Sequence, residues 1–211
     1  MWTAEETARV GAIAEKYELW LISDEIHCDL IRQGKKHIPT AKVMQDYPKL
    51  ITCMAASKTF NLAGLMFSNI IVRDAALRQQ MAAHDKTIGL VNPLSLAATQ
   101  AAYEQGEPWL QQLQVYLDGN FQFVADYLAA NLPQSVFCIP ESTYLAWLDV
   151  SRYFPETEDL PMFFANKAGV LLEGGDGMFV GNAAGYVRLN LAMPRAIIAK
   201  GLQRICEAIK L

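Results

Sequence analysis

Lys58 is the residue whose surroundings point most directly to chemistry. Small and apolar residues flank it, with Ala55 and Ala56 on one side and Phe60 on the other. A lysine held among such groups loses solvation, which disfavours its ammonium form and lowers its pKa. A neutral amine at working pH is what Schiff-base formation with a carbonyl compound requires. Taken alone, the segment favours the structural alternative, a loop lysine whose amine reaches water.

Asp24 adds a second chemical group. It follows the apolar run 19–23, which is typical of a buried parallel strand, so Asp24 and Glu25 are expected at the strand's carboxyl end. Ligands bind at that edge of open α/β sheets. A carboxylate there could keep the ring nitrogen of pyridoxal phosphate (PLP) protonated, as that cofactor requires when it accepts electrons. The structural alternative is a helix-capping or turn aspartate, the commoner role of this residue type.

The elements that must position these two residues alternate between helices and strands. Thr3 is a plausible N-cap for a first helix, with Glu5 and Glu6 in its first turn. Two further strands are expected over 50–54 and 67–72, separated by a loop over 55–64. Helices are expected over 74–84 and 93–131, with breaks at 106–108 and near Gly119.

The pattern changes after Pro133. Later strands are expected over 136–139, 144–150, 170–172 and 186–191, and helices over 160–167 and from Pro194 onward. The glycine-rich stretch before Arg188 indicates a loop and does not match a phosphate-binding fingerprint. This order of elements favours an α/β portion followed by a smaller α+β portion.

Composition excludes several classes of protein. The 211 residues carry a net charge of −4, with 52% hydrophobic and 19% charged residues, which argues against disorder. The acidic balance argues against partners such as nucleic acid or an anionic membrane. No apolar run approaches the roughly 18 residues of a bilayer span, and the first residues lack a signal-peptide pattern. Four cysteines without paired or clustered spacing predict buried free thiols, no metal site and a cytoplasmic location.

Three segments together carry a family resemblance. They are residues 23–30 (SDEIHCDL), 57–65 (SKTFNLAGL) and 186–195 (YVRLNLAMPR). In this order they resemble fold-type I PLP-dependent enzymes of the class I/II aminotransferase superfamily, and within it the cystathionine β-lyase-like C–S lyases. The resemblance implies an α/β fold. Residues 1–117 would be the C-terminal portion of the large PLP-binding domain, with a mainly parallel sheet, and residues 118–211 the small α+β domain.

The resemblance also implies a cofactor, PLP, and roles for individual residues. Lys58 would bond covalently to the cofactor and later carry the substrate's α-proton. Asp24 would hold the proton of the pyridine nitrogen. His27 stands where many relatives have a tyrosine that binds the phenolic oxygen, and its structural alternative is a core histidine bonded to a backbone carbonyl.

Arg188 would bind the substrate α-carboxylate, for which its planar guanidinium is suited. Without the family context, an arginine between Val187 and Leu189 is more often a structural ion-pair partner. Ser57 and Asn61 would line the cofactor pocket, although a turn-stabilising role fits them equally. The aromatic residues Trp109, Tyr144 and Trp147 are interpreted as core packing.

Departures from the family pattern limit what the resemblance implies. It aligns with only the second half of such enzymes, so the sequence is interpreted as a C-terminal fragment. Met66 stands where many relatives have a basic residue for the phosphate, and Ala55 where aminotransferases often have serine. Glu173 and Gly174 stand where a proline–glycine pair is common.

The expected function is PLP-dependent β-elimination from a small sulfur-containing amino acid, which gives a thiol, pyruvate and ammonia. An aminotransferase is the first alternative, because it would use the same residues. An inactive remnant or an interaction module is the second. The family resemblance further implies a homodimer, with residues 87–95 as the expected contact.

Overall fold

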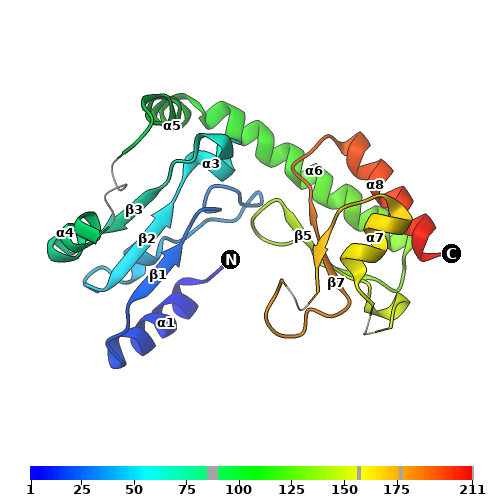
Figure 1. Cartoon of the computed structure of the whole chain (residues 1–211), viewed down its shortest axis with the longest axis horizontal. Coiled ribbons are helices and arrows are strands. Elements are labelled where there is room, and N and C mark those ends of the chain that lie inside the picture. The colour runs from blue at the N-terminus through cyan, green and yellow to red at the C-terminus, as the bar shows by residue number, and fades with distance from the viewer. Residues whose placement is uncertain (85–89, 156–157, 176–177, 211) are drawn as a thin grey trace. The chain divides into compact units, whose positions relative to one another are not determined.

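The computed structural model describes residues 1–84, 90–155, 158–175 and 178–210. These residues form two compact units, Met1–Gln114 and Val115–Leu211, each with its own sheet (Figure 1). The unit boundary lies within one long helix, α6 (Glu107–Asn131). The boundary expected from the sequence, after residue 117, falls in the same helix.

The first unit opens with α1 (Ala4–Lys16), and its N-terminus confirms the expected cap. The Thr3 hydroxyl accepts a hydrogen bond from the Glu6 amide at 3.1 Å, and the Glu6 carboxylate accepts one from the Thr3 amide at 2.8 Å. This reciprocal pair is a capping box, which satisfies two amides that the helix leaves unpaired.

The sheet of the first unit has the order β1–β2–β3. β1 (Leu21–Asp24) runs parallel to β2 (Leu50–Met54), whereas β3 (Asn69–Val72) is antiparallel to β2. The segment 55–66 between β2 and β3 holds two short helices, α3 (Ala56–Thr59) and the 3₁₀ turn η1 (Ala63–Leu65), where the sequence predicts a loop.

Three further helices complete the first unit up to α6. They are α2 (Thr40–Val43), α4 (Ala75–His84) and α5 (Pro93–Gln105). Gly106 ends α5, which confirms the expected break there, and the Phe60 ring fills the space beside its α-carbon. A small buried cluster lies between α1, α2 and β2 and consists of Ala14, Met44, Tyr47 and Leu50.

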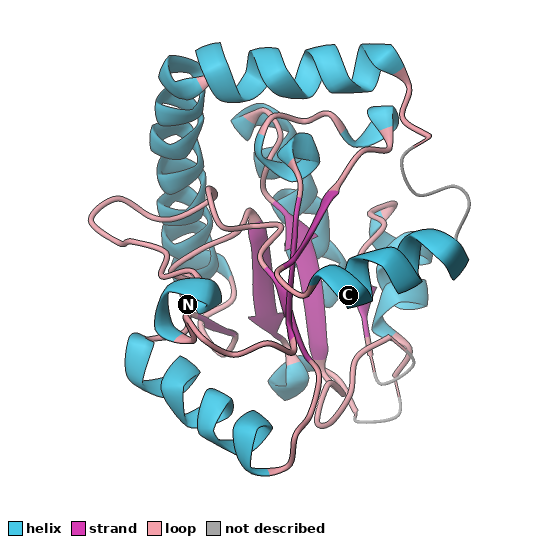
Figure 2. Cartoon of the chain, turned by 90° about the vertical axis from the view of Figure 1, so that its left-hand side faces the viewer, coloured by secondary structure: helices cyan, strands magenta, loops and turns pink. Residues whose placement is uncertain are grey.

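The expected break near Gly119 is wrong, because α6 is continuous through that residue (Figures 1 and 2). A β-carbon at Gly119 would come within 2.6 Å of the Arg195 guanidinium. Glycine at this position therefore serves a close side-chain approach rather than a helix end.

The second unit contains an antiparallel sheet of order β4–β5–β7–β6. Its strands are β4 (Val136–Phe137), β5 (Leu145–Asp149), β6 (Glu173–Gly174) and β7 (Tyr186–Asn190). The expected strand over 170–172 is wrong: Val170 and Leu172 pack against the core, and pairing with β7 begins at Glu173.

The inner face of this sheet packs against helices. Ala146 and Leu148 of β5 and Val187 and Leu189 of β7 are buried, and their neighbours in the strands are not. The core includes residues of α6, of α7 (Leu160–Ala168) and of α8 (Arg195–Ile209). The η2 turn (Ser151–Tyr153) follows β5.

Two aromatic predictions need correction. Trp109 and Trp147 are expected in the core, but their exposed fractions are 46% and 37%. Trp147 lies on the outer face of β5, where it stacks on Tyr186 at a centroid distance of 5.4 Å. Its ring therefore covers the open side of the sheet.

The structure also describes the cysteines, the apolar character of the helices and the grouping of potential metal ligands. All four cysteines are free thiols, but only Cys206 is buried as expected; Cys28 and Cys53 are half-buried, and Cys138 is exposed. Among the described residues, no helix is long and apolar enough to cross a membrane. The described residues also contain no group of three or more His, Cys, Asp or Glu side chains that could hold a metal ion.

Candidate active site

The first unit brings Asp24 and Lys58 to one edge of its sheet. Asp24 is the last residue of β1 and pairs in register with Cys53, near the end of the parallel strand β2. Lys58 lies in α3, which begins directly after β2 and its single linking residue Ala55. A carboxylate and an amine thus stand at the carboxyl ends of two neighbouring parallel strands, the edge where ligands bind in such sheets.

The Lys58 amine has no competing partner in the part of the chain that the structure describes. The residue is half-buried, and its side chain makes no hydrogen bond or ion pair with any described residue. This arrangement leaves the amine available to react with a ligand.

The helix that carries Lys58 is held firmly from its inner side. Thr59 is fully buried, and its hydroxyl donates to the Asp29 carboxylate at 2.9 Å. The Asp29 carbonyl in turn accepts from the Gln114 side chain at 2.8 Å. Phe60 packs edge-on against Tyr103 at 6.0 Å between ring centroids. Lys58 therefore projects from an anchored turn.

Ser57 and Asn61 belong to the same turn. The Ser57 carbonyl accepts from the Leu62 amide at 2.9 Å, and Asn61 has a left-handed backbone with φ of +55°. The turn is tied to α5, because the buried Ser95 hydroxyl donates to the Leu65 carbonyl at 2.7 Å. Met66 follows with 92% of its surface exposed.

Asp24 is open on one side. Its Oδ1 accepts from the Ile26 amide at 3.1 Å, the local bond expected of a turn aspartate. Its Oδ2 accepts no hydrogen bond from the described residues, and the residue is exposed. Asp24 therefore combines a fixed carboxylate with an oxygen that a ligand can reach.

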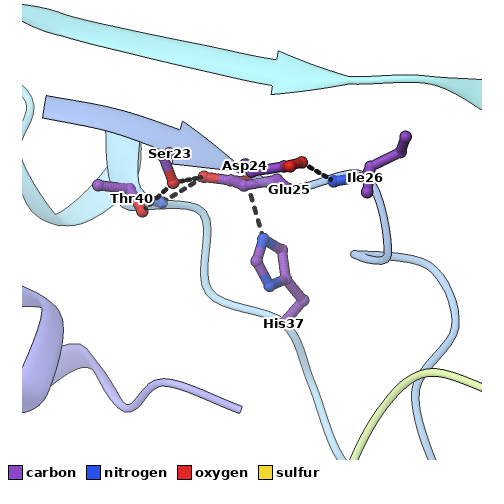
Figure 3. A network of polar contacts seen from close by, with 6 residues as sticks. All are labelled: Ser23, Asp24, Glu25, Ile26, His37 and Thr40. Atoms are coloured by element: carbon purple, nitrogen blue, oxygen red, sulfur yellow. Dashed lines mark hydrogen bonds and ion pairs between the residues drawn. The ribbon is translucent and has the colours of Figure 1, made fainter. Parts of the chain in front are cut away.

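Glu25, the next residue, has the opposite environment (Figure 3). Its side chain is only 6% exposed. Its Oε2 accepts from His37 Nε2 at 2.8 Å, and its Oε1 accepts from the Thr40 amide and the Ser23 hydroxyl, each at 3.0 Å. Burial alone would raise the pKa of Glu25, but the bonds from His37, Thr40 and Ser23, with the charge of His37, hold it below the ordinary value.

Proton accounting fixes the direction of the bonds around Glu25. The ionised carboxylate only accepts, so His37 carries a proton on Nε2 and the Ser23 hydroxyl donates to Oε1. Ser23 has then used its one proton. The Thr40 hydroxyl, 2.7 Å away, must therefore donate to Ser23.

His27 and Cys28 follow in the turn after Glu25. His27 is half-buried, and its carbonyl accepts from the Leu30 amide at 3.0 Å. Burial, with the negative charge of Asp29, raises the pKa of the Cys28 thiol to about 12. Cys28 is therefore a protonated thiol at neutral pH rather than a nucleophile.

Arg188 lies in the second unit, on the outer face of β7. One register row joins Trp147, Arg188 and Glu173 across β5, β7 and β6. The Arg188 Nε and Nη2 groups both bind the Glu173 Oε2, and the guanidinium lies 5.3 Å from the centroid of the Phe179 ring. Arg188 thus already binds one carboxylate, as expected if it is a structural ion-pair partner.

The sequence singled out Asp24, Ser57, Lys58 and Asn61, and the structure gathers them around one sheet edge and the turn beside it. His37 and Thr40 were not anticipated. A signal existed in the consecutive acids at positions 24 and 25, because two carboxylates at one strand end need different partners.

Comparison with known proteins identifies the family. Residues 1–205 match the model of the aminotransferase class I and II family. The chain is 36% identical over 211 residues to cystathionine beta-lyase PatB of Bacillus subtilis and 33% identical over 213 residues to protein MalY of Escherichia coli. These matches cover 99% and 100% of the chain, but 54% of each relative, so the chain spans about half their length.

Solved structures agree with this assignment. The PLP-bound C–S lyase of Staphylococcus hominis superimposes with a TM-score of 0.94 at 51% identity, covering 99% of this chain and 53% of that one. Cystalysin of Treponema denticola, whose structure contains PLP, gives a TM-score of 0.92 at 31% identity. The predicted α/β fold is therefore confirmed, and the chain belongs to the aminotransferase class I and II family.

Proposed function

We propose that this protein catalyses PLP-dependent C–S β-elimination from a small sulfur-containing amino acid. The observation that carries the proposal is the placement of Asp24 at the carboxyl end of β1 and of Lys58 in the short helix that follows the adjacent parallel strand β2. A relative named cystathionine beta-lyase and a PLP-bound C–S lyase are each similar to this chain over 99% of its length, which supports the proposal.

The residues at this edge suit PLP by their chemistry. The Lys58 amine is the group that would bond the cofactor's aldehyde, and the open Asp24 oxygen would accept the proton of the ring nitrogen. Ser57, Asn61 and His27 lie on the segments beside them and would supply polar contacts. When bound, PLP stabilises negative charge that develops at the substrate α-carbon.

The chain's own residues would then act on the substrate in two ways. Arg188 would bind the α-carboxylate and orient the substrate. After the substrate amine has replaced it at the cofactor aldehyde, the freed Lys58 amine would take the proton from Cα. The electron pair of that C–H bond would form the Cα–Cβ double bond, and the thiolate would leave Cβ. The enamine product would take up water and give pyruvate and ammonia.

Aminotransfer is the second candidate, because the matching family model describes aminotransferases. It would use the same Lys58, Asp24 and Arg188. The reactions differ in where the proton taken by Lys58 is returned and in whether a thiol is released. Family membership alone does not separate them.

We also propose that the protein is a cytoplasmic homodimer. Residues 87–89 of the expected contact lie outside the described residues. In the rest of it, Asn92 caps α5 by accepting from the Leu94 amide at 2.9 Å, and Leu90 and Leu94 are 80% and 72% exposed. Exposed apolar side chains of this size support an interface between two copies.

The test compares Lys58→Arg with Lys16→Arg, an exposed lysine on α1 that serves as the matched control. Added PLP should give the unaltered protein and the control a visible absorbance band, and cystathionine should then yield pyruvate and thiol. Lys58→Arg should give neither. Conversion that requires a keto acid and releases no thiol would select the aminotransferase. A colourless protein that is indifferent to PLP would support an inactive remnant or interaction module.

A further inference from the structure

We propose that Glu25 is a positioning residue for Asp24. In this proposal, the buried Glu25 carboxylate binds the segment 37–40 and thereby fixes the backbone turn that orients the Asp24 carboxylate toward its ligand. The inference rests on the proposed function for the role of Asp24. The contacts that support it are properties of this chain alone.

The two consecutive acids, Asp24 and Glu25, lie in different environments. Glu25 is buried and accepts from His37, Thr40 and Ser23, so both of its oxygens are engaged (Figure 3). Asp24 is exposed and has one oxygen that no described residue binds. Carboxylates in such different environments take different roles. Both oxygens of Glu25 are already engaged, whereas Asp24 has an oxygen that a ligand can reach.

Two backbone hydrogen bonds connect the position of Glu25 to that of Asp24. The Glu25 amide donates to the Cys53 carbonyl at 2.8 Å, which extends the β1–β2 pairing beyond Asp24. The Ile26 amide, on the other side of Glu25, donates to Asp24 Oδ1. A rotation of the Glu25 backbone would disturb both bonds. The side chain of Glu25 therefore controls the peptide groups on either side of it.

The donors to Glu25 come from a segment well separated from it in the sequence. His37 and Thr40 lie 12 and 15 residues after Glu25, so their bonds close the intervening chain into a loop. The Thr40 hydroxyl donates to Ser23, which donates to Glu25, and this relay reaches β1 on the other side of Asp24. Asp24 is thus bracketed by two residues that the same network holds.

The test uses NMR and needs no bound cofactor. In Glu25→Gln, we expect the Asp24 carboxyl carbon and the Ile26 amide to shift, and the Ile26 amide proton to exchange about tenfold faster. Glu18→Gln is the matched control, because Glu18 also forms an ion pair but its side chain is 86% exposed. It should leave the Asp24 and Ile26 signals unchanged.

A second pair of variants tests the same link without altering Glu25. His37→Phe removes the donor to Oε2 and should reproduce the Asp24 and Ile26 shifts. His37→Gln retains an N–H donor and should return the Asp24 and Ile26 signals part of the way to their original positions. This pair also decides the matter if Glu25→Gln does not fold.

A cofactor readout then separates positioning from simple stability. PLP should bind Glu25→Gln about tenfold more weakly than the unaltered protein, while its covalent attachment at Lys58 is retained. Unchanged Asp24 and Ile26 signals, beside a shifted Thr40 amide, would overturn the proposal and leave Glu25 as an anchor for 37–40 alone. If the unaltered protein binds no PLP, the proposed function fails, and the NMR comparison still decides whether Glu25 positions Asp24.

Discussion

At the scale of single residues, environment assigns different tasks to chemically similar groups. Asp24 and Glu25 carry the same functional group, yet the first is open to a ligand and the second is saturated with donors. Lys58 is half-buried and unengaged among the described residues, whereas Lys49 donates to the Glu18 carbonyl at 2.8 Å. Reactivity follows from which partners a side chain already has.

Glu25 should make the stability of the protein depend on pH in the acid range. Its hydrogen bonds hold its folded-state pKa below the ordinary value of 4.5. The stabilisation is therefore fully present above pH 4.5 and is lost as pH falls through the lower, folded-state pKa. At pH 7, Glu25→Gln should lower the free energy of unfolding by about 1–3 kcal/mol.

Urea unfolding of both proteins between pH 7 and pH 3 measures this effect. The difference between the unaltered protein and Glu25→Gln should shrink below pH 4.5. A difference that stays constant over the whole range would show that the ionised Glu25 carboxylate does not stabilise the fold.

The sequence was sufficient to place Asp24 at the end of a strand, because an apolar run that ends in an acid predicts a strand end. It placed Lys58 only in the segment that follows the strand over 50–54. It was not sufficient to pair Glu25 with His37. That bond depends on how residues 26–36 return to β1, and the local pattern of those residues does not determine their path. Long-range partners of a polar residue follow from the fold.

At the scale of elements, the strand register places Arg188, which binds a carboxylate, on the outer face of the second sheet. The row Trp147, Arg188 and Glu173 combines a guanidinium, its carboxylate partner and an aromatic ring. Glu173 binds Nε and Nη2 of Arg188, and no described residue forms a hydrogen bond or ion pair with Nη1. The strand register, more than any one residue, creates this arrangement.

Arg188→Lys should raise KM for the amino-acid substrate by about tenfold or more, because an ammonium group cannot reproduce the planar set of donors with which a guanidinium binds Glu173 and a second carboxylate at once. The expected change in kcat is smaller, since Arg188 is proposed to bind rather than to transfer protons. Steady-state kinetics over a range of substrate concentrations separate the two constants. An unchanged KM would exclude Arg188 as the carboxylate anchor.

Asn120 joins α6 to the segment between β7 and α8. Its fully buried amide donates to the carbonyls of Leu191 and Met193, and its oxygen accepts from Arg195 Nε. Asn120→Ala would leave these buried groups unsatisfied and should lower the free energy of unfolding by about 2–3 kcal/mol.

Asn131→Ala is the control for Asn120→Ala, because among the described residues the Asn131 amide donates only to the Tyr127 carbonyl, within its own helix. Urea denaturation of both variants should show a clearly larger loss for Asn120→Ala. Equal losses would mean that the contacts between α6 and the β7–α8 segment contribute little.

Element prediction failed where long-range packing decided the outcome. Gly119 suggested a helix end, but the Arg195 guanidinium occupies the space where a side chain would be. The short apolar run 170–172 suggested a strand, but its residues pack on the core, and Glu173 and Gly174 pair instead. Helix starts were predicted better, because caps such as Thr3 are local.

At the scale of the whole molecule, the two units differ in the extent of their cores. In the first unit the described buried residues that pack into one cluster are Ala14, Met44, Tyr47 and Leu50, and other buried apolar residues such as Leu30 and Val72 lie outside it. Ile22 and Ile70 on its sheet are 65% and 49% exposed. The second unit has a cluster that spans β5, β7, α6, α7 and α8. Burial of apolar surface is the main stabilising contribution, so the second unit should be more stable.

Native-state hydrogen exchange should report this difference directly. We expect backbone amides of β5 and β7 to exchange on the order of 100-fold more slowly than those of β1 and β3. Equal protection in the two sheets would mean that they unfold as one cooperative unit.

The central claim is that Lys58 is the residue that bonds PLP covalently. Reduction of the PLP-treated protein with borohydride, followed by peptide mass analysis, tests it most directly. We predict a single modified lysine, Lys58, and no modification of that peptide in Lys58→Arg. A protein without an adduct, or with adducts spread evenly over its surface lysines, would contradict the claim.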